Sequence, residues 1–301
     1  MKHTANSGIL LLDKPEGLTS FGVVRRVKWV LGVKKIGHLG TLDPFATGLL
    51  PLGVNEGTKL TPFLMGEPKT YRATLKLGEE TDTQDLTGKI TARSDKLPEA
   101  DTVRRMAARF VGEINQAPPM FSAVHHQGER LYNLARRGEK VEPAPRPVVI
   151  HELQVEAVAL PLVTFTVRCS KGTYIRTLAA DLGRALGCGA HLVALRRLEV
   201  GPFSVEEALT LEELQEMAPE DIWARLIPPA RCLTGMKAVM VEPEEARQVA
   251  QGRPLIRTGA ELEVGEQVRV MNDGELVAVA RVGLKEDMAL IKPVRVFAAG
   301  T

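Results

Sequence analysis

A glycine-rich segment between Gly37 and Gly48, GHLGTLDPFATG, contains the densest group of residues that could carry out chemistry. It holds one carboxylate, Asp43, and a histidine, His38, five residues before it. Glycines at this density allow the backbone to approach a ligand closely. An aspartate before a proline is otherwise a common turn or helix-cap residue, so Asp43 on its own does not define a reaction.

Two other kinds of site are disfavoured by their spacing. The runs at 53–59, GVNEGTK, and at 37–40, GHLG, match neither the GxxxxGK[ST] nor the GxGxxG pattern of phosphate-binding loops. A pair of carboxylates for glycoside hydrolysis could come from the acidic segment at 78–88. We expect the acids of that segment to be solvated or to cap a turn: Glu79, Glu80, Asp82 and Asp85.

Basic residues are unevenly distributed, although the formal net charge of the 301-residue chain is only +2. Residues 17–42 contain no acid but five basic residues: Arg25, Arg26, Lys28, Lys34 and Lys35. A second basic stretch contains Arg130, Arg136, Arg137, Lys140 and Arg146. Either stretch alone is typical of a solvated helix face. Two of them flanking the Asp43 segment favour contacts with the phosphates of a nucleic acid.

The cysteines and the apolar runs indicate where the protein works. Cys169, Cys188 and Cys232 are odd in number and far apart, which argues against a disulfide framework or a structural zinc site. The first apolar run, at 9–12, is too short for a signal-peptide core, and no run is long enough to span a membrane. We expect a soluble, cytoplasmic protein.

The elements around the Asp43 segment follow from hydrophobic periodicity. Residues 8–12 are predicted to form a buried strand, and Thr19 or Ser20 to cap a helix that ends at Gly32. A long glycine-rich loop is expected at 37–57. In the next strand Tyr71 lies on the apolar side, because Ala73, Leu75 and Leu77 follow it at alternate positions. The acidic segment at 78–88 is then its turn.

Further elements follow along the chain. A helix is expected at 103–111 with its end at Gly112, then a mobile, polar insertion at about 123–147 with a short helix at 130–137. A strand at 163–169 leads into a helix that stops at Gly187. Pro228 and Pro229 mark a linker. After it a helix at 243–251 precedes three strands, at 267–271, 276–282 and 289–297, with a hairpin turn at 272–274.

Six segments, in this order, resemble the signature motifs of TruB-type pseudouridine synthases. They are KPEGLTS at 14–20, GHLGTLDPFATGLLP at 37–51, YRATLKLGEETDTQDLTG at 71–88, QAPPMFSA at 116–123, CSKGTYIRTL at 169–178 and AHLVALRRLEVGPF at 190–203. Two positions depart from the family pattern. His125 stands where a lysine is usual, and Gly57 begins the Gly-Thr-Lys that replaces Ala-Thr-Lys. The first departure puts one RNA contact of the insertion in doubt, and the second is not expected to affect the chemistry.

The resemblance implies a role for each matched residue. Asp43 would be the catalytic carboxylate that acts on the ribose, Arg176 its ionic partner, and Tyr71 the ring that stacks on the target base. Tyr174 and Leu195 would line the same slot. His38 would contact RNA when the uridine is flipped out of its loop. Lys14 and Lys59 would position the RNA backbone. Pseudouridine and uridine have the same composition, so no cofactor and no metal are expected.

The implied fold is mixed α/β (α+β). A pseudouridine-synthase catalytic domain at 1–232 would have a mixed, largely antiparallel sheet with flanking helices, and a small β-barrel-like, PUA-type RNA-binding module would follow at 237–298. The implied reaction is isomerisation of the T-loop uridine of tRNA, uridine 55, by a monomer without an obligatory protein partner. Two alternatives remain at this point: the catalytic subunit of a guide-RNA-directed synthase, and a non-catalytic tRNA-binding or tRNA-folding protein.

Overall fold

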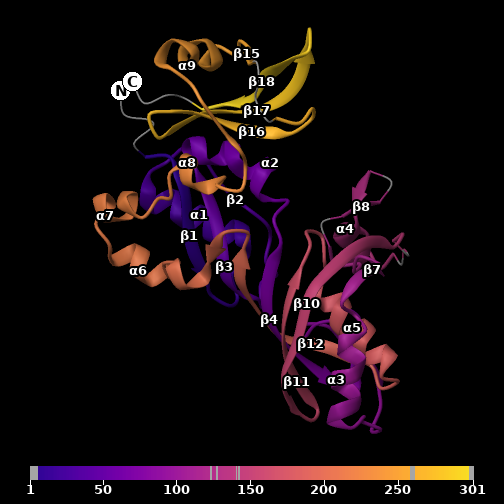
Figure 1. Cartoon of the computed structure of the whole chain (residues 1–301). Helices are drawn as coiled ribbons and strands as arrows, with labels where there is room; N and C mark the ends of the chain where they lie inside the picture. The colour runs from indigo at the N-terminus through magenta and orange to yellow at the C-terminus, as the bar shows by residue number, and fades with distance from the viewer. Residues whose placement is uncertain are drawn as a thin grey trace.

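A computed structural model describes residues 6–122, 124–126, 128–139, 141, 143–257 and 262–297. Its centre is a nine-stranded sheet that runs the length of the molecule (Figure 1). Seven strands form its path in the order β1 (Gly8–Lys14), β3 (Thr47–Val54), β12 (Ala190–Val200), β4 (Lys69–Leu77), β11 (Leu162–Cys169), β10 (Arg146–Ala159) and β7 (Gly112–Gln116). Two short strands extend it: β2 (Ile36–His38) pairs with β3, and β13 (Phe203–Ser204) with β12. Within this sheet only β3 and β12 pair in parallel, so the prediction of a mixed, largely antiparallel sheet is confirmed.

Helices cover the two ends of this sheet. Near β1 and β3 lie α1 (Ser20–Leu31), α6 (Leu211–Glu216) and α7 (Pro219–Ala224), whose apolar side chains form one core cluster with those strands. At the other end α3 (Ala100–Ala108) and α5 (Ile175–Ala185) pack on the strands β10, β12 and β4 around a second cluster (Figure 1). The strands between these clusters therefore have a rigid backing at both ends of the sheet.

Local sequence signals explain the boundaries of α1. The Thr19 side chain accepts a hydrogen bond from the Gly22 amide at 2.9 Å, and the helix ends at Gly32, whose φ is 61°. Val23, Val27 and Leu31 are buried against the sheet, as their spacing predicts. The predicted strand through Tyr71 and the helix that ends at Gly187 are also confirmed, the latter with φ of 76° at that glycine.

Two predicted element boundaries were wrong. The segment at 37–57 is not one long loop, because residues Thr47–Val54 form the buried strand β3, which pairs with the whole length of β1. The leucines of β3 are buried in the core, and their burial stabilises the strand although glycine and proline are unfavourable in strands. Likewise the helix at 103–111 ends at Ala108, and Gly112 instead opens β7 with φ of 108°. A positive φ of this kind favours glycine, and it lets the chain turn into the strand.

Short elements complete the first 232 residues. The acidic segment forms β5 (Glu79–Thr81), which pairs with β6 (Ile90–Arg93). In the insertion β8 (His125–His126) pairs with β9 (Glu129–Arg130), and α4 (Leu131–Arg136) confirms the predicted short helix. Its mobility remains a prediction, and residues 123, 127, 140 and 142 lie outside the described part. The remaining pieces are η1 (Asn55–Leu60), α2 (Thr61–Leu64), η2 (Val205–Glu207) and α8 (Pro229–Cys232).

The C-terminal module is a five-stranded sheet with one helix, α9 (Pro243–Ala250). The strands follow the order β14 (Ala238–Met240), β16 (Gln267–Asn272), β17 (Glu275–Lys285), β18 (Met288–Val296) and β15 (Leu255–Arg257). Asp273 and Gly274 have φ of 46° and 78°, which confirms the predicted tight hairpin. The half-barrel shape of the sheet fits the predicted PUA-type module (Figure 1).

A shared apolar cluster joins this module to the rest of the chain. Leu39 and Leu49, which lie before and after Asp43 in the sequence, belong to the same buried cluster as Met271, Leu276 and Phe297 of the module. Cys232 and Leu233, between the two parts, are buried in it as well. No helix of the described residues is long and apolar enough to cross a membrane.

Candidate active site

The segment that carries Asp43 is held from the side of α1. Ser20, the first residue of that helix, accepts a hydrogen bond from the Leu42 amide at 2.8 Å and donates one to the Leu42 carbonyl at 3.1 Å. The Gly17 amide donates to the Pro44 carbonyl at 2.8 Å. Because the backbone is fixed on both sides of Asp43, its carboxylate has a defined position before any ligand arrives.

Asp43 forms an ion pair with Arg176, as the sequence predicts. The Nε of Arg176 lies 3.0 Å from Oδ2 of Asp43, and its Nη2 lies 3.4 Å from Oδ1. The arginine side chain is only 5% exposed, whereas the aspartate side chain is 33% exposed. The carboxylate is therefore held by a buried cation and remains open on one side, where a substrate can reach it.

A second carboxylate, Asp85, holds the same arginine. Its Oδ2 lies 3.4 Å from Nη1 of Arg176, while its Oδ1 accepts hydrogen bonds from Thr83 Oγ1 at 2.7 Å and from the Thr87 amide at 2.9 Å. Asp85 is 3% exposed, so of the two expected roles it caps its turn and is not solvated. Its threonine neighbours satisfy it in a buried turn, and the carbonyl of Phe121 takes a further Arg176 hydrogen bond at 2.9 Å. The guanidinium is thus fixed in place by groups other than Asp43.

Burial sets the protonation of Asp43 more than its ion pair does. Burial raises the pKa of Asp43 above its ordinary value, while Arg176 opposes the shift; the nearby Asp85 raises it further and Lys14 lowers it. The net direction is upward. The charge of Arg176 is therefore the smaller of the two leading effects on the pKa of Asp43.

Lys14 lies inside the fold and not on its surface. It is 0% exposed, and its Nζ donates to the carbonyls of Pro15 at 2.8 Å and Pro44 at 3.2 Å. Burial lowers the pKa of Lys14 to about 8, against the opposing attraction of Asp43 and Glu16. Its contacts hold Pro44, the residue after Asp43. A lysine that binds RNA phosphates would instead present its Nζ at the surface.

Tyr71 lies on β4 next to Arg197 of β12, and its ring packs on the core cluster that contains Leu195 and Leu42. Burial raises the pKa of the Tyr71 hydroxyl, while the charge of Arg197 and a hydrogen bond from it lower the pKa. The phenol therefore stays protonated near neutral pH. Leu195 is buried in the cluster against which this ring packs, and its role as the lining of a base-binding slot stays a prediction.

Tyr174 is positioned by its backbone, and His38 lies close enough to Arg197 to feel its charge. The Tyr174 amide donates to Gln116 Oε1 at 2.7 Å, and Gln116 Nε2 donates back to the Tyr174 carbonyl at 3.0 Å, which fixes the start of α5 just before Arg176. His38 ends β2, and burial followed by the charge of Arg197 lowers its pKa, so its ring is neutral. Its Nδ1 is buried without a hydrogen-bond partner in the structure.

Lys59 lies apart from Asp43, between η1 and the C-terminal module. Its Nζ donates to the Val296 carbonyl at 2.9 Å, lies 5.9 Å from the centroid of the Phe297 ring, and forms a short ion pair with Glu56. In this position Lys59 links the two parts of the chain. Asp43, Arg176 and Tyr71 are brought together, and Lys59 is not part of that group.

Arg197 is the residue of the site that the sequence reading missed. It is 1% exposed, and its guanidinium donates to the carbonyls of Leu49 at 2.7 Å, Gly40 at 3.1 Å and Thr41 at 3.5 Å. It therefore holds both ends of the segment that carries Asp43, in addition to Tyr71. Its position in the AHLVALRRLEVGPF motif was the available signal.

Substitution of Gly48 tests the packing of β3 against β12 at Arg197. A Cβ at Gly48 would lie 2.2 Å from the Arg197 carbonyl oxygen, and the glycine has φ of 99°. We expect Gly48→Ala to lower the free energy of unfolding by about 2–3 kcal/mol or more, because both the clash and the backbone conformation are unfavourable. Urea unfolding of the two proteins measures it.

The matched control for this substitution is Gly37→Ala. No atom lies within 4 Å of a Cβ at Gly37, and its φ is outside the left-handed region. We expect a change within about 0.5 kcal/mol. Equal stabilities for the two variants would show that the packing of β3 against Arg197 does not constrain residue 48.

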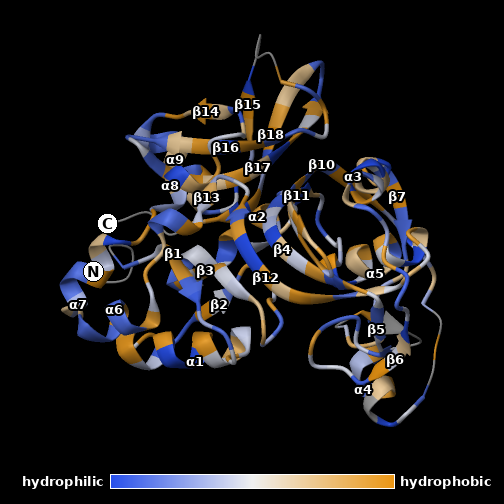
Figure 2. Ribbon diagram, turned by 90° about the horizontal axis from the view of Figure 1, so that it is seen from below, coloured by the Kyte–Doolittle hydropathy of each residue, from blue (hydrophilic) through white to orange (hydrophobic). Residues whose placement is uncertain are grey.

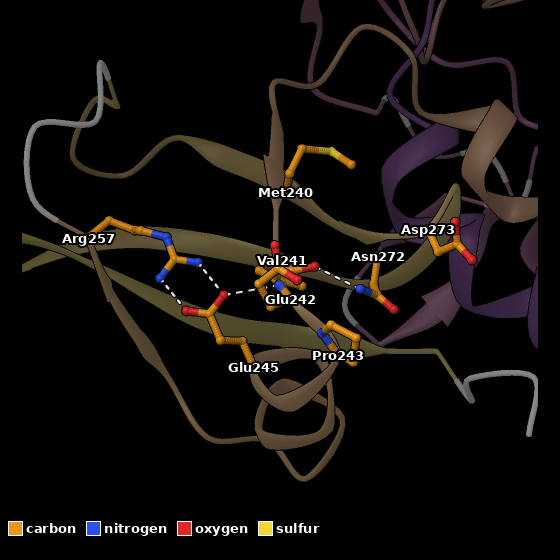
Figure 3. A pocket seen from close by; sticks show the side chains of 8 residues that line it. All are labelled: Met240, Val241, Glu242, Pro243, Glu245, Arg257, Asn272 and Asp273. Carbon is orange, nitrogen blue, oxygen red and sulfur yellow. Dashed lines mark hydrogen bonds and ion pairs between the residues drawn. The ribbon is translucent and has the colours of Figure 1, made fainter.

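A separate hollow of about 640 Å³ lies on the C-terminal module (Figure 3). The acids Glu242, Glu245 and Asp273 line it together with one cation, Arg257. Figure 3 shows that this arginine is directed at Glu245, with distances of 2.6 and 2.8 Å between their nitrogen and oxygen atoms. The lining is acidic and its cation is already paired, so this hollow does not suit an RNA phosphate.

Comparison with known proteins places this site in a family. Residues 28–175 match the TruB family pseudouridylate synthase (N terminal domain) and residues 176–232 match the tRNA pseudouridylate synthase B C-terminal domain. The chain belongs to the TruB family of pseudouridylate synthases. It is 47% identical over 281 residues to the tRNA pseudouridine synthase B of Geobacter sulfurreducens, covering 91% of this chain and 92% of that protein. It is 45% identical to the protein of the same name from Burkholderia pseudomallei, covering 93% and 95%.

Solved structures agree with this assignment. An H/ACA RNP bound to a substrate RNA containing 2'-deoxyuridine has a chain with a TM-score of 0.76 and 26% identity, covering 98% of this chain and 86% of that one. A Cbf5-Nop10-Gar1 complex gives a TM-score of 0.77 and 28% identity, with coverage of 97% and 84%. The fold is therefore that of the pseudouridine synthases, including the C-terminal module.

Proposed function

We propose that the protein isomerises the T-loop uridine of tRNA, uridine 55, to pseudouridine, with Asp43 as the catalytic carboxylate. Its enzyme class is established by its family and by its curated relatives: it is an isomerase, a tRNA pseudouridine synthase. The observation that carries the proposal for the site is the ion pair of Asp43 with the buried Arg176, which leaves the carboxylate partly open beside Tyr71.

The proposed reaction breaks the bond between N1 of uracil and C1′ of the ribose, turns the base, and joins C5 to C1′. Asp43 acts on the ribose, as nucleophile or as base. The Tyr71 ring stacks on the detached base, a positioned group takes the proton from C5, and a proton is returned to N1. Atoms and charge balance within the substrate, so the reaction consumes no external reagent.

The target uridine lies inside a folded RNA loop, so it has to leave the loop before it can reach Asp43. His38 is our candidate for the contact that replaces it, since its ring is neutral and its buried Nδ1 is unpartnered. Lys14 would act indirectly, by fixing Pro44. For Lys59 we propose a role at the junction with the C-terminal module, which at 237–298 would bind RNA beyond the catalytic domain at 1–232.

The direct test is to incubate the protein alone with unmodified tRNA, digest the tRNA to nucleosides, and separate them by chromatography. We expect a uridine isomer of unchanged mass at position 55, formed without any guide RNA. A product that forms only when a guide RNA is added would instead favour the guide-directed subunit. Binding without any product would favour an RNA-folding protein. We further propose that the enzyme acts as a monomer in the cytoplasm, where its substrate is found.

The protonation of Asp43 predicts a pH dependence. If the working form is the carboxylate, single-turnover isomerisation falls as the pH decreases through a pKa that burial raises above the usual value of about 3.9. We therefore expect the acid limb of the rate profile to lie above that of a solvent-exposed aspartate. Circular dichroism at each pH separates this effect from acid unfolding. A rate that is constant down to pH values near 4 would contradict it.

A further inference from the structure

The outward face of α1 carries two large aromatic side chains that the fold does not use. Phe21 is 71% exposed and Trp29 is 84% exposed. Successive helical residues are 100° apart, so Phe21, Arg25 and Trp29, at intervals of four, lie on one face, and Lys28 lies beside them. We call these four residues the α1 stripe. In Figure 2 the helix lies at the edge of the molecule, with apolar and polar residues alternating along it.

The core does not explain the α1 stripe. The opposite face of the helix already buries Val23, Val24, Val27 and Leu31. An amphipathic helix needs only polar residues on its exposed face. Large apolar side chains grouped on that face therefore indicate a contact site.

The cations of the α1 stripe are also unused within the fold. In the described part of the chain neither Arg25 nor Lys28 has an ion pair or a hydrogen bond through its side chain, whereas Arg72, Arg196 and Arg257 elsewhere each pair with a carboxylate. Residues 17–42 contain no acid at all. The α1 stripe therefore presents cations that form no ion pair, interleaved with aromatic faces, which is complementary to nucleotides: phosphates for the cations and bases for the rings.

The α1 stripe begins at the catalytic segment. Ser20, next to Phe21, binds both backbone groups of Leu42, the residue before Asp43. From Phe21 to Trp29 the helix rises about 12 Å. The stripe therefore starts one residue from the contact that holds the catalytic segment, within reach of an RNA whose uridine lies at Asp43.

We propose that the α1 stripe is a second RNA-binding site, which takes unpaired nucleotides of the tRNA from outside its T-stem-loop. The bases stack on Phe21 and Trp29, and Arg25 and Lys28 contact the phosphates. Unpaired nucleotides are required because paired bases do not expose a face for stacking. Nucleotides of the T-loop itself are engaged at Asp43. This proposal rests on tRNA being the substrate, as proposed above.

The chain contains only two tryptophans, Trp29 and Trp223, which allows a direct test. Trp223→Phe keeps an aromatic ring at a partly buried position and leaves Trp29 as the sole indole reporter. We expect full-length tRNA to quench its fluorescence, and an isolated T-stem-loop RNA to leave it largely unchanged. Absence of quenching by bound tRNA overturns the proposal. A response to anionic lipid vesicles but not to tRNA overturns it in favour of a membrane surface.

Kinetics of two matched variants distinguish stacking from simple apolar contact. For Trp29→Leu we expect KM for full-length tRNA to rise about tenfold with kcat unchanged, and KM for the T-stem-loop to stay within twofold. Trp29→Phe keeps an aromatic face and should stay within about threefold of the original protein on both RNAs. Arg25→Gln should lower the slope of log binding against log salt by about 1 for tRNA only.

The outcomes separate this proposal from the proposed function. A KM that rises equally on both RNAs, or not at all for Trp29→Leu, overturns the role of the α1 stripe while the enzyme still forms pseudouridine. If the original protein forms no pseudouridine on either RNA, the proposed function fails, and the fluorescence titration still decides whether RNA covers Trp29. Both aromatic residues are exposed, so their substitution leaves the core of the fold intact.

Discussion

Replacement of Asp43 by Asn is expected to abolish isomerisation while RNA binding stays within about threefold. The amide has nearly the same shape and keeps the hydrogen bonds of the segment, but it can neither attack the ribose nor take a proton from it. Single-turnover product formation falls by at least about 10⁴-fold, a loss typical when a group essential to a covalent or proton-transfer step is removed. Chromatography of digested tRNA measures it, with filter binding as the companion assay.

Asp95→Asn is the matched control for this substitution, because Asp95 is exposed and its side chain forms no ion pair or hydrogen bond with the described residues. We expect it to change neither rate nor affinity. Substantial turnover by the Asp43 variant would remove that residue from the mechanism and leave the RNA-folding alternative standing. Loss of binding together with turnover would instead show that the carboxylate holds the segment in shape.

Removal of the Tyr71 hydroxyl alone should slow turnover much more than it weakens binding. Tyr71→Phe keeps the ring on Leu195, and stacking of a base on such a face is worth roughly 1–3 kcal/mol without any hydroxyl. The proton on C5 must still be taken by a positioned base, a contribution of about 10²–10⁴-fold. Burial keeps the Tyr71 phenol protonated near neutral pH. For its oxygen to accept the C5 proton, the phenol must therefore pass its own proton to another group.

Tyr71→Leu should lose both properties, since it removes the stacking face together with the hydroxyl. Single-turnover rates and equilibrium binding for the original protein and both variants give the comparison. A Phe variant as fast as the original protein would leave Tyr71 with a stacking role only. A Leu variant that binds tRNA normally would show that the ring does not contact the base at all.

The elements that the sequence predicts well are those whose apolar residues recur with a regular period. Thr19 and Gly32 delimit α1 because capping and left-handed termination are local effects. The alternation through Tyr71 predicts β4 for the same reason, since each side of the strand has its own environment. The pairing of Asp43 with Arg176 could be expected only through family resemblance, because 133 residues separate them.

What the sequence did not predict depends on contacts between distant segments. Strand β3 contains Gly48, Pro51 and Gly53, which are typical of loops, and its burial arises from pairing with β1, β2 and β12. Asp85 is an ordinary polar residue of an acidic turn until Arg176, 91 positions later, reaches it. Arg197 likewise becomes informative only once its strand passes behind the Asp43 segment. No periodicity encodes such encounters.

The apolar cluster that joins Leu39 and Leu49 to Phe297 has a consequence for the energetics of the whole molecule. Unfolding the C-terminal module would expose side chains on either side of the Asp43 segment to water, at about 25 cal/mol for each Å² of apolar surface. The module and the catalytic segment therefore share part of their stability, and heat or denaturant should melt them in one cooperative transition. A ligand that binds only to the module would raise the melting temperature of the active site as well.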